Sequence, residues 1–293
     1  RRKAVSSRLM GEETQDGTVD QYGIVGHPVA QSRSPFIHGL FAKQTGQRMA
    51  YRLYDVPSDD FLAHVTRFFS GGGCGLNVTI PHKPAAAAFA HALTPRAEQA
   101  RAVNTLKMQP DGTVLGDNTD GVGLVRDLTG NLGLVVAGLR VLILGAGGAT
   151  RGIVAPLLDL APAELLIANR TPERARIVAA SFADLGPVKG CGFHELEPRP
   201  WDLVINATAA SPTGGRPEVS PAIVAAGTIC YDMAYGQELT RFLHWALAEG
   251  AAAAHLGWGM LVEQAAESFY LWRGVRPETR PVLEVLKDWR TPS

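Results

Sequence analysis

The stretch VLILGAGGATRG, residues 141–152, decides the fold of this chain. Its first four residues are apolar, a run too short for a helix but typical of a parallel strand buried on both faces. A glycine cluster follows, and then Ile153, Val154, Leu157 and Leu158 recur at helical spacing. Glycines let the backbone turn sharply beside a ligand, and the amino end of the new helix favours an anion such as a pyrophosphate. The order of strand, turn and helix therefore predicts a dinucleotide-binding unit.

The glycine pattern departs from the usual dinucleotide fingerprint at one position. Gly145 and Gly147 fit the pattern G-x-G-x-x-G, whereas Thr150 stands at the third glycine position. A glycine-rich turn in some other α/β protein is the alternative for this stretch taken alone.

Composition places the chain among ordinary globular proteins. Its 293 residues, 46% of them hydrophobic and 19% charged, suffice for a large core and predict two domains rather than one. The formal net charge is zero, so no overall field draws the chain to nucleic acid or to an anionic membrane. Asp159 and Glu164 interrupt the longest apolar run, which leaves no stretch of the roughly 18 to 20 residues that a membrane helix needs. The N-terminal residues lack the apolar segment of a secretory signal.

Cysteines and histidines give no sign of a metal site. Cys74, Cys191 and Cys230 lie far apart and form no C-x-x-C pair, and the eight histidines form no H-E-x-x-H pattern. We therefore expect reduced thiols, no structural metal and a cytoplasmic location.

The N-terminal part begins with an expected disordered extension, residues 1–20, which is polar and without periodicity. A strand is predicted at residues 22–25, and Ser34 with Pro35 predicts the N-cap and first position of a helix. Capping explains Ser34 but not Ser32, which lies outside the helix and is a candidate to hold a hydroxylated ligand. Taken singly, each serine is better explained by structure than by function.

Polar side chains follow the next buried strand. The predicted strand at residues 76–80 alternates and places Asn77 and Thr79 on one face. Pro81 ends the strand, and Lys83 follows in the predicted loop at its carboxyl end, where open α/β sheets place their ligands. A solvated surface lysine is the alternative for Lys83.

A second polar run follows a predicted alanine-rich helix at residues 85–92 and a predicted hairpin with an Asp-Gly turn. This run is GDNTDG, residues 116–121. Turn chemistry explains every residue in it. The functional alternative makes Asp120 the carboxylate of a polar site that faces Lys83.

The second half of the chain repeats strand and helix, which predicts a parallel, doubly wound sheet with right-handed crossovers. Its strands are expected at residues 141–144, 165–168, 203–205 and 229–231.

The residues after the second of these strands bear on the cofactor. A carboxylate commonly ends this strand in NAD-binding domains, where it accepts hydrogen bonds from the ribose. Here Asn169 is followed by Arg170 and, after Thr171 and a proline, by Arg174. Guanidinium groups suit a 2′-phosphate by charge and geometry, so the pattern favours NADP over NAD. Solvated arginines are the alternative.

The C-terminal part predicts an amphipathic helix that opens at Gly257 and a last helix over residues 281–289. Both helices need an apolar surface. A return to the first domain would supply it and would let Gln264 face the cleft.

Six motifs in series resemble the shikimate dehydrogenase family of aromatic amino-acid (chorismate) biosynthesis. They are SxSP at residues 32–35, NVTxPxK at 77–83, AVNTL at 102–106, GDNTDG at 116–121, GAGGA at 145–149 and NRT at 169–171. The resemblance implies an α/β substrate-binding catalytic domain of residues 21–121 and 255–293. It implies a Rossmann-like NADP-binding domain of residues 122–254, with the C-terminal helices returning to the first domain.

The same resemblance implies a set of site residues. The catalytic pair is Lys83 and Asp120. The substrate is held by this pair and by Ser32, Ser34, Asn77, Thr79, Asn104, Tyr235 and Gln264. NADP is bound by Gly145, Ala146, Gly147, Gly148, Ala149, Asn169, Arg170, Thr171, Arg174, Met233 and Gly257. One departure concerns the nicotinamide end, where many relatives have Asp and Leu around the aligned glycine and this chain has Leu256 and Trp258.

The implied activity is the reversible, NADPH-dependent reduction of 3-dehydroshikimate to shikimate, with Lys83 as proton donor or electrostatic stabiliser and Asp120 positioning it. Within the family, a quinate/shikimate dehydrogenase that uses NAD is the alternative. Outside it, a methyltransferase or a non-catalytic nucleotide-sensing regulator keeps a glycine-rich first turn. We expect a small-molecule substrate as the partner, no nucleic acid or membrane, and a monomer or homodimer.

Overall fold

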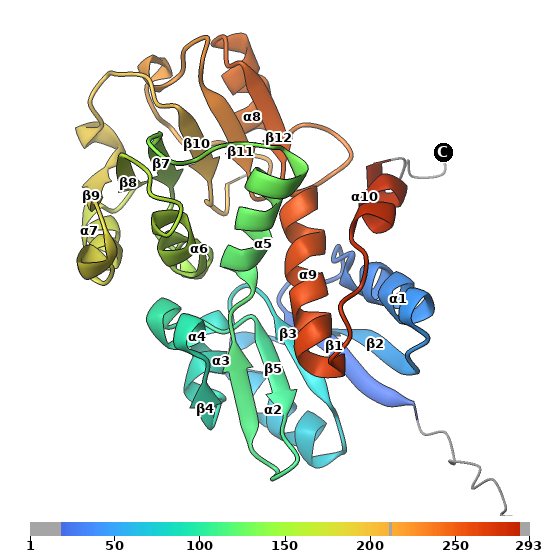
Figure 1. Cartoon of the computed structure of the whole chain (residues 1–293). Helices are drawn as coiled ribbons and strands as arrows, with labels where there is room; N and C mark the ends of the chain where they lie inside the picture. Colours follow the sequence, from blue (N-terminus) through green and yellow to red (C-terminus); the bar gives the residue numbers. More distant parts are fainter. Residues whose placement is uncertain (1–18, 211–212, 288–293) are drawn as a thin grey trace, which may run out of the picture.

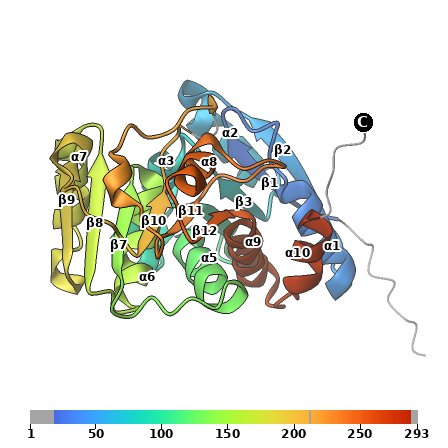
Figure 2. The same ribbon diagram turned by 90° about the horizontal axis from the view of Figure 1, so that it is seen from above.

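The computed structural model of the protein describes residues 19–210 and 213–287 and consists of two lobes, each built on a six-stranded sheet (Figure 1). Helices α5 (Asp120–Arg126) and α9 (Trp258–Arg273) lie side by side between the lobes, and the chain passes from one lobe to the other through them (Figures 1 and 2). Both connections between the lobes therefore run through this pair of helices.

The first sheet is mixed, with the strand order β2-β1-β3-β5-β6-β4. Its strands are β1 (Asp20–Gly26), β2 (Met49–Asp55), β3 (Gly75–Val78), β4 (Ala92–Leu93), β5 (Thr105–Met108) and β6 (Val114–Asp117). Strand β1 pairs in parallel with β2 and β3, whereas β5 is antiparallel to β3 and β6. The register places Asn77 opposite Thr105 and Thr105 opposite Asp117. Three polar side chains are thereby lined up across the sheet at the end nearest the other lobe.

Two hydrophobic clusters hold this lobe together. One contains Phe61 and Phe69 and is formed with helices α2 (Phe61–Ser70), α3 (Lys83–Phe89) and α4 (Pro95–Ala100). The other contains Phe41 and Phe269 and joins α1 (Ser34–Thr45) to α9 and α10 (Arg280–Lys287). The C-terminal helices therefore return to the first lobe, as the sequence predicted.

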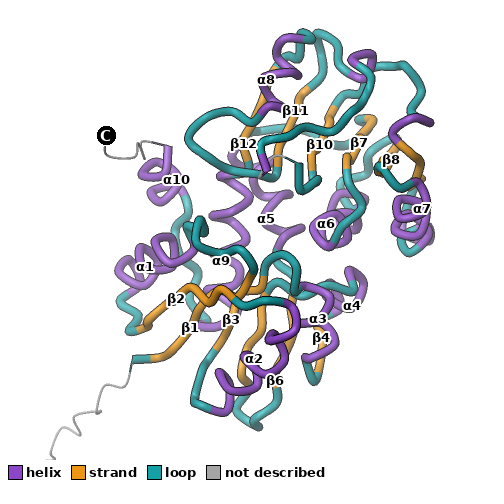
Figure 3. The backbone as a smooth tube through the Cα atoms, turned by 180° about the vertical axis from the view of Figure 1, so that it is seen from behind, coloured by secondary structure: helices purple, strands orange, loops and turns teal. Residues whose placement is uncertain are grey.

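The second sheet is parallel throughout, with the strand order β12-β11-β10-β7-β8-β9 (Figure 3). Its strands are β7 (Arg140–Leu144), β8 (Glu164–Asn169), β9 (Val188–Gly192), β10 (Leu203–Asn206), β11 (Ile229–Asp232) and β12 (Ala253–Leu256). The helices beside them are α6 (Gly148–Leu158), α7 (Pro172–Ala180) and α8 (Arg241–Ala248).

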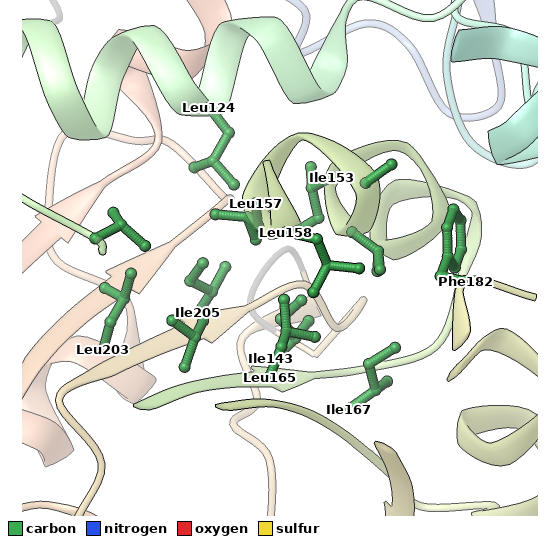
Figure 4. Close-up of a cluster of buried hydrophobic side chains, with 14 of the residues drawn as sticks. Leu124, Ile143, Ile153, Leu157, Leu158, Leu165, Ile167, Phe182, Leu203 and Ile205 are labelled. Carbon is green, nitrogen blue, oxygen red and sulfur yellow. The ribbon is translucent and has the colours of Figure 1, made fainter. Parts of the chain in front are cut away.

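Strand β7 is buried on both faces, as its four apolar residues predicted. Val141 and Ile143 belong to the cluster formed with α5, α6 and α7, part of which is drawn in Figure 4. Leu142 and Leu144 belong to the opposite cluster, which contains Phe242 of α8. Helices on both faces of a parallel sheet define the doubly wound α/β arrangement.

Several predicted boundaries were wrong by a few residues. Helix α1 begins at Ser34 itself, with Arg33 at the cap position and Pro35 as the second helical residue, so Ser34 is not the N-cap. Lys83 is not in a loop but is the first residue of α3, and that helix ends at Phe89 because Ala92 and Leu93 pair with β6. Alanine has the highest helix propensity, but propensity is a weak determinant compared with tertiary context, and strand pairing overrides it here.

At the ends of the chain, β1 begins at Asp20, the last residue of the expected disordered extension, and α10 is described up to Lys287. The rest of that extension, residues 1–18, and the predicted end of the last helix at residue 289 lie outside the described residues. The division into residues 21–121 with 255–293 and 122–254 stays a prediction.

Candidate active site

A lysine and an aspartate from the first residues of two helices form an ion pair between the lobes. Lys83 Nζ of α3 donates to Asp120 Oδ2 of α5 over 2.5 Å, and the two side chains are only 12% and 8% exposed. Gly148, the first residue of α6, lies beside them, because a Cβ built on it would be 3.7 Å from Lys83 Cβ. The structure thus brings together the predicted catalytic pair and the predicted glycine loop.

The hairpin of β5 and β6 brings this pair together. The backbone N–H of Val103, just before β5, donates to the carbonyl of Lys83 over 3.0 Å. The backbone N–H of Asn104 donates to the carbonyl of Asp117, the last residue of β6, over 3.0 Å. Lys83 and the segment leading to Asp120 are therefore tied to the same short stretch of backbone from both sides.

Asn104 connects the carboxylate to helix α9. Its Nδ2 donates to Asp120 Oδ1 (3.0 Å), to Thr119 Oγ1 (2.9 Å) and to Gln264 Oε1 (3.3 Å), and its Oδ1 accepts from the backbone N–H of Thr119 (2.9 Å). The Thr119 hydroxyl donates to the backbone carbonyl of Gln264 over 3.0 Å. Gln264 therefore lies against Asn104 and Thr119, and its role in the site stays a prediction. Thr119 is a neighbour of the ion pair that was not named from the sequence.

Asn77 lies in a buried network behind this group. Its Oδ1 accepts from the hydroxyl of Tyr51 over 2.7 Å. Its Nδ2 donates to Thr105 Oγ1 (3.1 Å), Ser268 Oγ (3.0 Å) and the carbonyl of Asn104 (3.2 Å). With the side chain only 5% exposed, its amide group is fully engaged by protein. Sequence reasoning missed Tyr51 and Ser268, which lie 26 and 191 residues from Asn77.

The two serines predicted to hold substrate each lie beside a tyrosine. Ser34 lies near the hydroxyl of Tyr51, and Ser32 lies near the hydroxyl of Tyr235, which comes from the other lobe. Burial raises the pKa of both tyrosine hydroxyls, so both stay neutral and able to donate at neutral pH. Ser32 Oγ also accepts from the backbone N–H of Ser34 over 3.3 Å, so it supports the start of α1 as well as facing the cleft. Thr79, directly after β3, is half-buried.

The glycine loop after β7 has the shape that close ligand approach needs. Gly145 has a φ of +108°, and a side chain there would meet the backbone of Ala207 at 3.0 Å. A Cβ on Gly147 would meet no atom within 4 Å, so space is open above the amino end of α6. Thr150 fits the third glycine position because its hydroxyl turns back to donate to the carbonyl of Gly145 over 2.9 Å. Ala146 and Ala149 complete the loop as half-buried residues.

The residues after β8 present two arginines to solvent. Arg170 and Arg174 are exposed, and within residues 19–210 and 213–287 neither guanidinium forms an ion pair. Asn169 Nδ2 donates to the carbonyl of Thr171 over 2.9 Å, which fixes the turn into α7. Thr171 is the cap residue of α7, but its side chain does not cap the helix. Two exposed guanidinium groups that form no ion pair with the described residues thus follow β8, a donor set that fits a phosphorylated ribose.

Met233 and Gly257, predicted at the nicotinamide end, are in close contact. A Cβ on Gly257 would lie 2.5 Å from the carbonyl oxygen of Met233, so only glycine fits there. Leu256, which stands where many relatives have Asp, ends β12 and packs against the hydrophobic cluster on the α8 side of the sheet.

A buried histidine behind the site bears on stability. His38 of α1 is fully buried and stacks on Tyr51 with ring centroids 4.4 Å apart. Neither of its ring nitrogens has a hydrogen-bond partner among the described residues. Burial lowers the pKa of His38 from 6.5 to about 3, so the imidazole is neutral in the folded protein.

We expect this histidine to make the protein less stable in mild acid. Between pH 6.5 and about 3 the unfolded chain binds a proton at His38 that the folded chain does not, so the free energy of unfolding falls as the pH falls. At pH 5 the loss from His38 is about 2 kcal/mol, at about 1.4 kcal/mol per pH unit. Urea unfolding at pH 7 and pH 5 measures it, and His38→Phe should lose less stability over this range than the wild type. An equal loss in both proteins would contradict the assignment.

The described residues form neither a membrane span nor a metal cluster. Across residues 19–210 and 213–287, no helix is both long and apolar enough to span a bilayer. The same residues contain no group of three or more His, Cys, Asp or Glu side chains placed to hold a metal ion.

The fold and the site define a class, that of two-lobed α/β proteins with a Rossmann-like sheet and a polar cleft beside its glycine loop. Profiles of this class match the chain in three parts. They are the shikimate dehydrogenase substrate binding domain over residues 24–106, the shikimate/quinate 5-dehydrogenase profile over 130–219 and the shikimate 5′-dehydrogenase C-terminal domain over 257–287.

The chain is also similar to individual proteins of the family that these profiles describe. The shikimate dehydrogenase (NADP(+)) of Methylococcus capsulatus is 56% identical over 271 residues, which are 92% of this chain and 97% of that protein. The Ael1 enzyme of Pseudomonas putida superposes with a TM-score of 0.84 at 43% identity, over 91% of this chain and 98% of its own. The shikimate 5-dehydrogenase of Thermus thermophilus was solved with NADP(H) and shikimate. It superposes with a TM-score of 0.79 at 30% identity, over 91% of this chain and 98% of its own. The chain belongs to the shikimate dehydrogenase family.

Proposed function

We propose that this protein is an NADP-dependent shikimate dehydrogenase, which reversibly reduces 3-dehydroshikimate to shikimate. The observation that carries the proposal is the ion pair of Lys83 and Asp120 beside Gly148, in a chain whose relatives bear that name. Membership in a dehydrogenase family sets the methyltransferase alternative aside. A nucleotide-sensing regulator has no use for a buried lysine between the two lobes.

The residues present fit the cofactor and the substrate. The open space at Gly147 and the exposed guanidinium groups of Arg170 and Arg174 suit the pyrophosphate and the 2′-phosphate of NADP. Met233 and Gly257 are proposed at the nicotinamide end, where NADPH supplies a hydride. Ser32, Ser34, Asn77, Thr79, Asn104, Tyr235 and Gln264 are proposed to line the substrate site together with the catalytic pair.

In the proposed reaction, the catalytic pair of Lys83 and Asp120 transfers a proton to or from the substrate oxygen. As negative charge builds on the ketone oxygen of 3-dehydroshikimate, Lys83 Nζ donates a proton or stabilises that charge. Asp120 holds the ammonium group in place through Oδ2, and Asn104 fixes Asp120 through Oδ1. In shikimate oxidation the same lysine takes up the proton. The low exposure of both side chains keeps water from competing for it.

Steady-state assays with shikimate and NADP, followed by NADPH absorbance, test the proposal. Quinate with either cofactor is the specific comparison, since one matching profile covers shikimate and quinate enzymes alike. Quinate carries one more hydroxyl and a saturated carbon beside its carboxylate. We expect its kcat/KM to be lower by about 10²-fold, the usual discrimination against an added hydroxyl. Comparable efficiency on quinate with NAD would replace the proposal with the quinate/shikimate alternative. NADP binding without any turnover would favour the regulator.

Cofactor choice gives a sharper prediction. Arg170→Ala should weaken NADP binding by about 1.5 to 3 kcal/mol, the contribution of a hydrogen bond to a charged group, which is roughly 10- to 150-fold in Kd. NAD binding should stay nearly unchanged. Arg176→Ala is the matched control, because that arginine of the neighbouring helix α7 already pairs with Glu173 and Glu195. Equal losses for NADP and NAD would refute the role of Arg170.

The remaining expectations concern the whole molecule. We propose a cytoplasmic enzyme, monomeric or homodimeric, without affinity for nucleic acid. We also propose the division into a substrate-binding domain of residues 21–121 and 255–293 and an NADP-binding domain of residues 122–254. Sedimentation of the purified protein with and without NADP distinguishes monomer from dimer.

A further inference from the structure

The loop after β11 carries Tyr235 from the second lobe to the first. Its hydroxyl lies beside the side chain of Ser32 and the backbone of Arg33, both of which belong to the segment before α1. Tyr235 is therefore the side chain through which this loop reaches the proposed substrate site.

Two consecutive residues at the start of α9 hold this loop on either side of Tyr235. The backbone N–H of Gly257 donates to the carbonyl of Ala234 over 2.9 Å. The indole Nε1–H of Trp258 donates to the carbonyl of Gly236 over 3.0 Å. Both flanking peptide groups are thus tied to α9, and the position of Tyr235 between them is fixed.

Trp258 also contacts Tyr235 itself and the core of the first lobe. The two rings lie with centroids 5.0 Å apart at 46°. On its other side Trp258 packs against the hydrophobic cluster of α1, α9 and α10, which contains Phe41 and Phe269. One side chain therefore links the hydrophobic cluster of α1, α9 and α10 to the loop that carries Tyr235.

We propose that Trp258 is a positioning residue that holds Tyr235 against Ser32 and thereby sets the affinity for shikimate. The proposal rests on the function proposed above. A tyrosine already held in its bound position loses little conformational freedom when substrate arrives. Tyr235 lies beside the segment before α1, whereas the Lys83 ammonium pairs with Asp120, so we expect the effect to fall on substrate binding and not on the chemical step.

Trp258→Leu tests this, with shikimate Kd measured by calorimetry and KM and kcat measured with NADP. We expect Kd and KM for shikimate to rise about 5- to 30-fold, from one lost hydrogen bond and one newly mobile side chain. The kcat and the NADP Kd should change less than about threefold. Trp258→Phe keeps the ring but not the indole donor, and should raise the shikimate Kd by only about threefold. Trp245→Leu is the matched control, since Trp245 is also half-buried but lies on α8 beside Arg216.

A double-mutant cycle with Tyr235→Ala separates positioning from general packing. If Trp258 acts through Tyr235, Trp258→Leu should add less than about twofold to the shikimate Kd in the Tyr235→Ala background. Fully additive losses, or a Trp258→Leu variant with wild-type Kd, would overturn the proposal. Thermal unfolding checks that each variant folds. If Trp258→Leu does not fold, the shikimate Kd of Trp258→Phe tests the proposal instead. A wild type that neither binds nor oxidises shikimate overturns both proposals, whereas normal wild-type turnover with an unchanged Trp258→Leu variant overturns this one alone.

Discussion

Lys83→Ala is expected to lower the turnover of shikimate by about 10²- to 10⁴-fold, the range that proton transfer by a positioned side chain contributes. The structure leaves no substitute for this amine, because Asn104 donates to Asp120 but no second ammonium reaches that carboxylate within the described residues. The KM for shikimate should rise much less, since several hydroxyl and amide groups share the proposed binding of the substrate. Rates at saturating shikimate and NADP measure the effect.

Two further variants make this result specific. Lys83→Met keeps the length of the side chain and should lose turnover like Lys83→Ala, which excludes a packing effect. Lys189→Ala removes an exposed lysine of β9 and should behave as wild type. Asp120→Asn keeps the acceptor for Asn104 but removes the charge, and should also depress turnover. Near-normal turnover in Lys83→Ala and Lys83→Met would show that the mechanism proposed for this site is wrong.

The parts of the fold that were predictable are those with strong local patterns. Buried parallel strands such as β7 are continuous apolar runs, and α9 follows a helical period of apolar residues. Strands β9 and β12 escaped prediction because both are edge strands of the second sheet and contain few of the β-branched and aromatic residues that favour strands. Strand β9 reads VKGCG, and β12 is half-buried along its whole length. Their pairing depends on neighbours that no local pattern shows.

The same distinction applies to the site. Motif order and strand ends suggested that Lys83 and Asp120 face each other. In the structure, Lys83 Nζ lies 2.5 Å from Asp120 Oδ2. The hydrogen-bond partners of Asn77 could not be predicted from the sequence, because they come from β2, β5 and α9 and meet only after the first sheet has formed. Ser268 shows no sequence signal at all. It is a small polar residue in an amphipathic helix, and only tertiary packing buries it among Asn77, Thr105 and Thr119.

Another buried carboxylate, that of Asp117, fixes the turn that precedes Asp120. Asp117, the last residue of β6, is 1% exposed in its side chain and accepts from Arg96 Nε (2.7 Å), Arg96 Nη2 (2.5 Å) and Thr94 Oγ1 (2.6 Å). Its Oδ1 also accepts from the backbone N–H of Asn118 over 2.8 Å. The carboxylate therefore anchors the turn that leads, three residues later, to Asp120.

Arg96→Ala should destabilise the fold by about 3 kcal/mol, because it leaves this charge buried without its cation. The value lies at the low end of the usual 3 to 5 kcal/mol, about right for a carboxylate that keeps Thr94 and Asn118 as donors. Arg276→Ala is the control, since that exposed arginine pairs with the same Glu267 as Arg96 and should cost less than about 1 kcal/mol. Urea unfolding at neutral pH measures both. In an Arg96→Ala background, Asp117→Asn should recover part of the loss, because the uncompensated charge is gone. A loss below about 1 kcal/mol for Arg96→Ala would mean that the remaining donors alone satisfy Asp117, and that the anchor of the Asp120 turn does not depend on the ion pair.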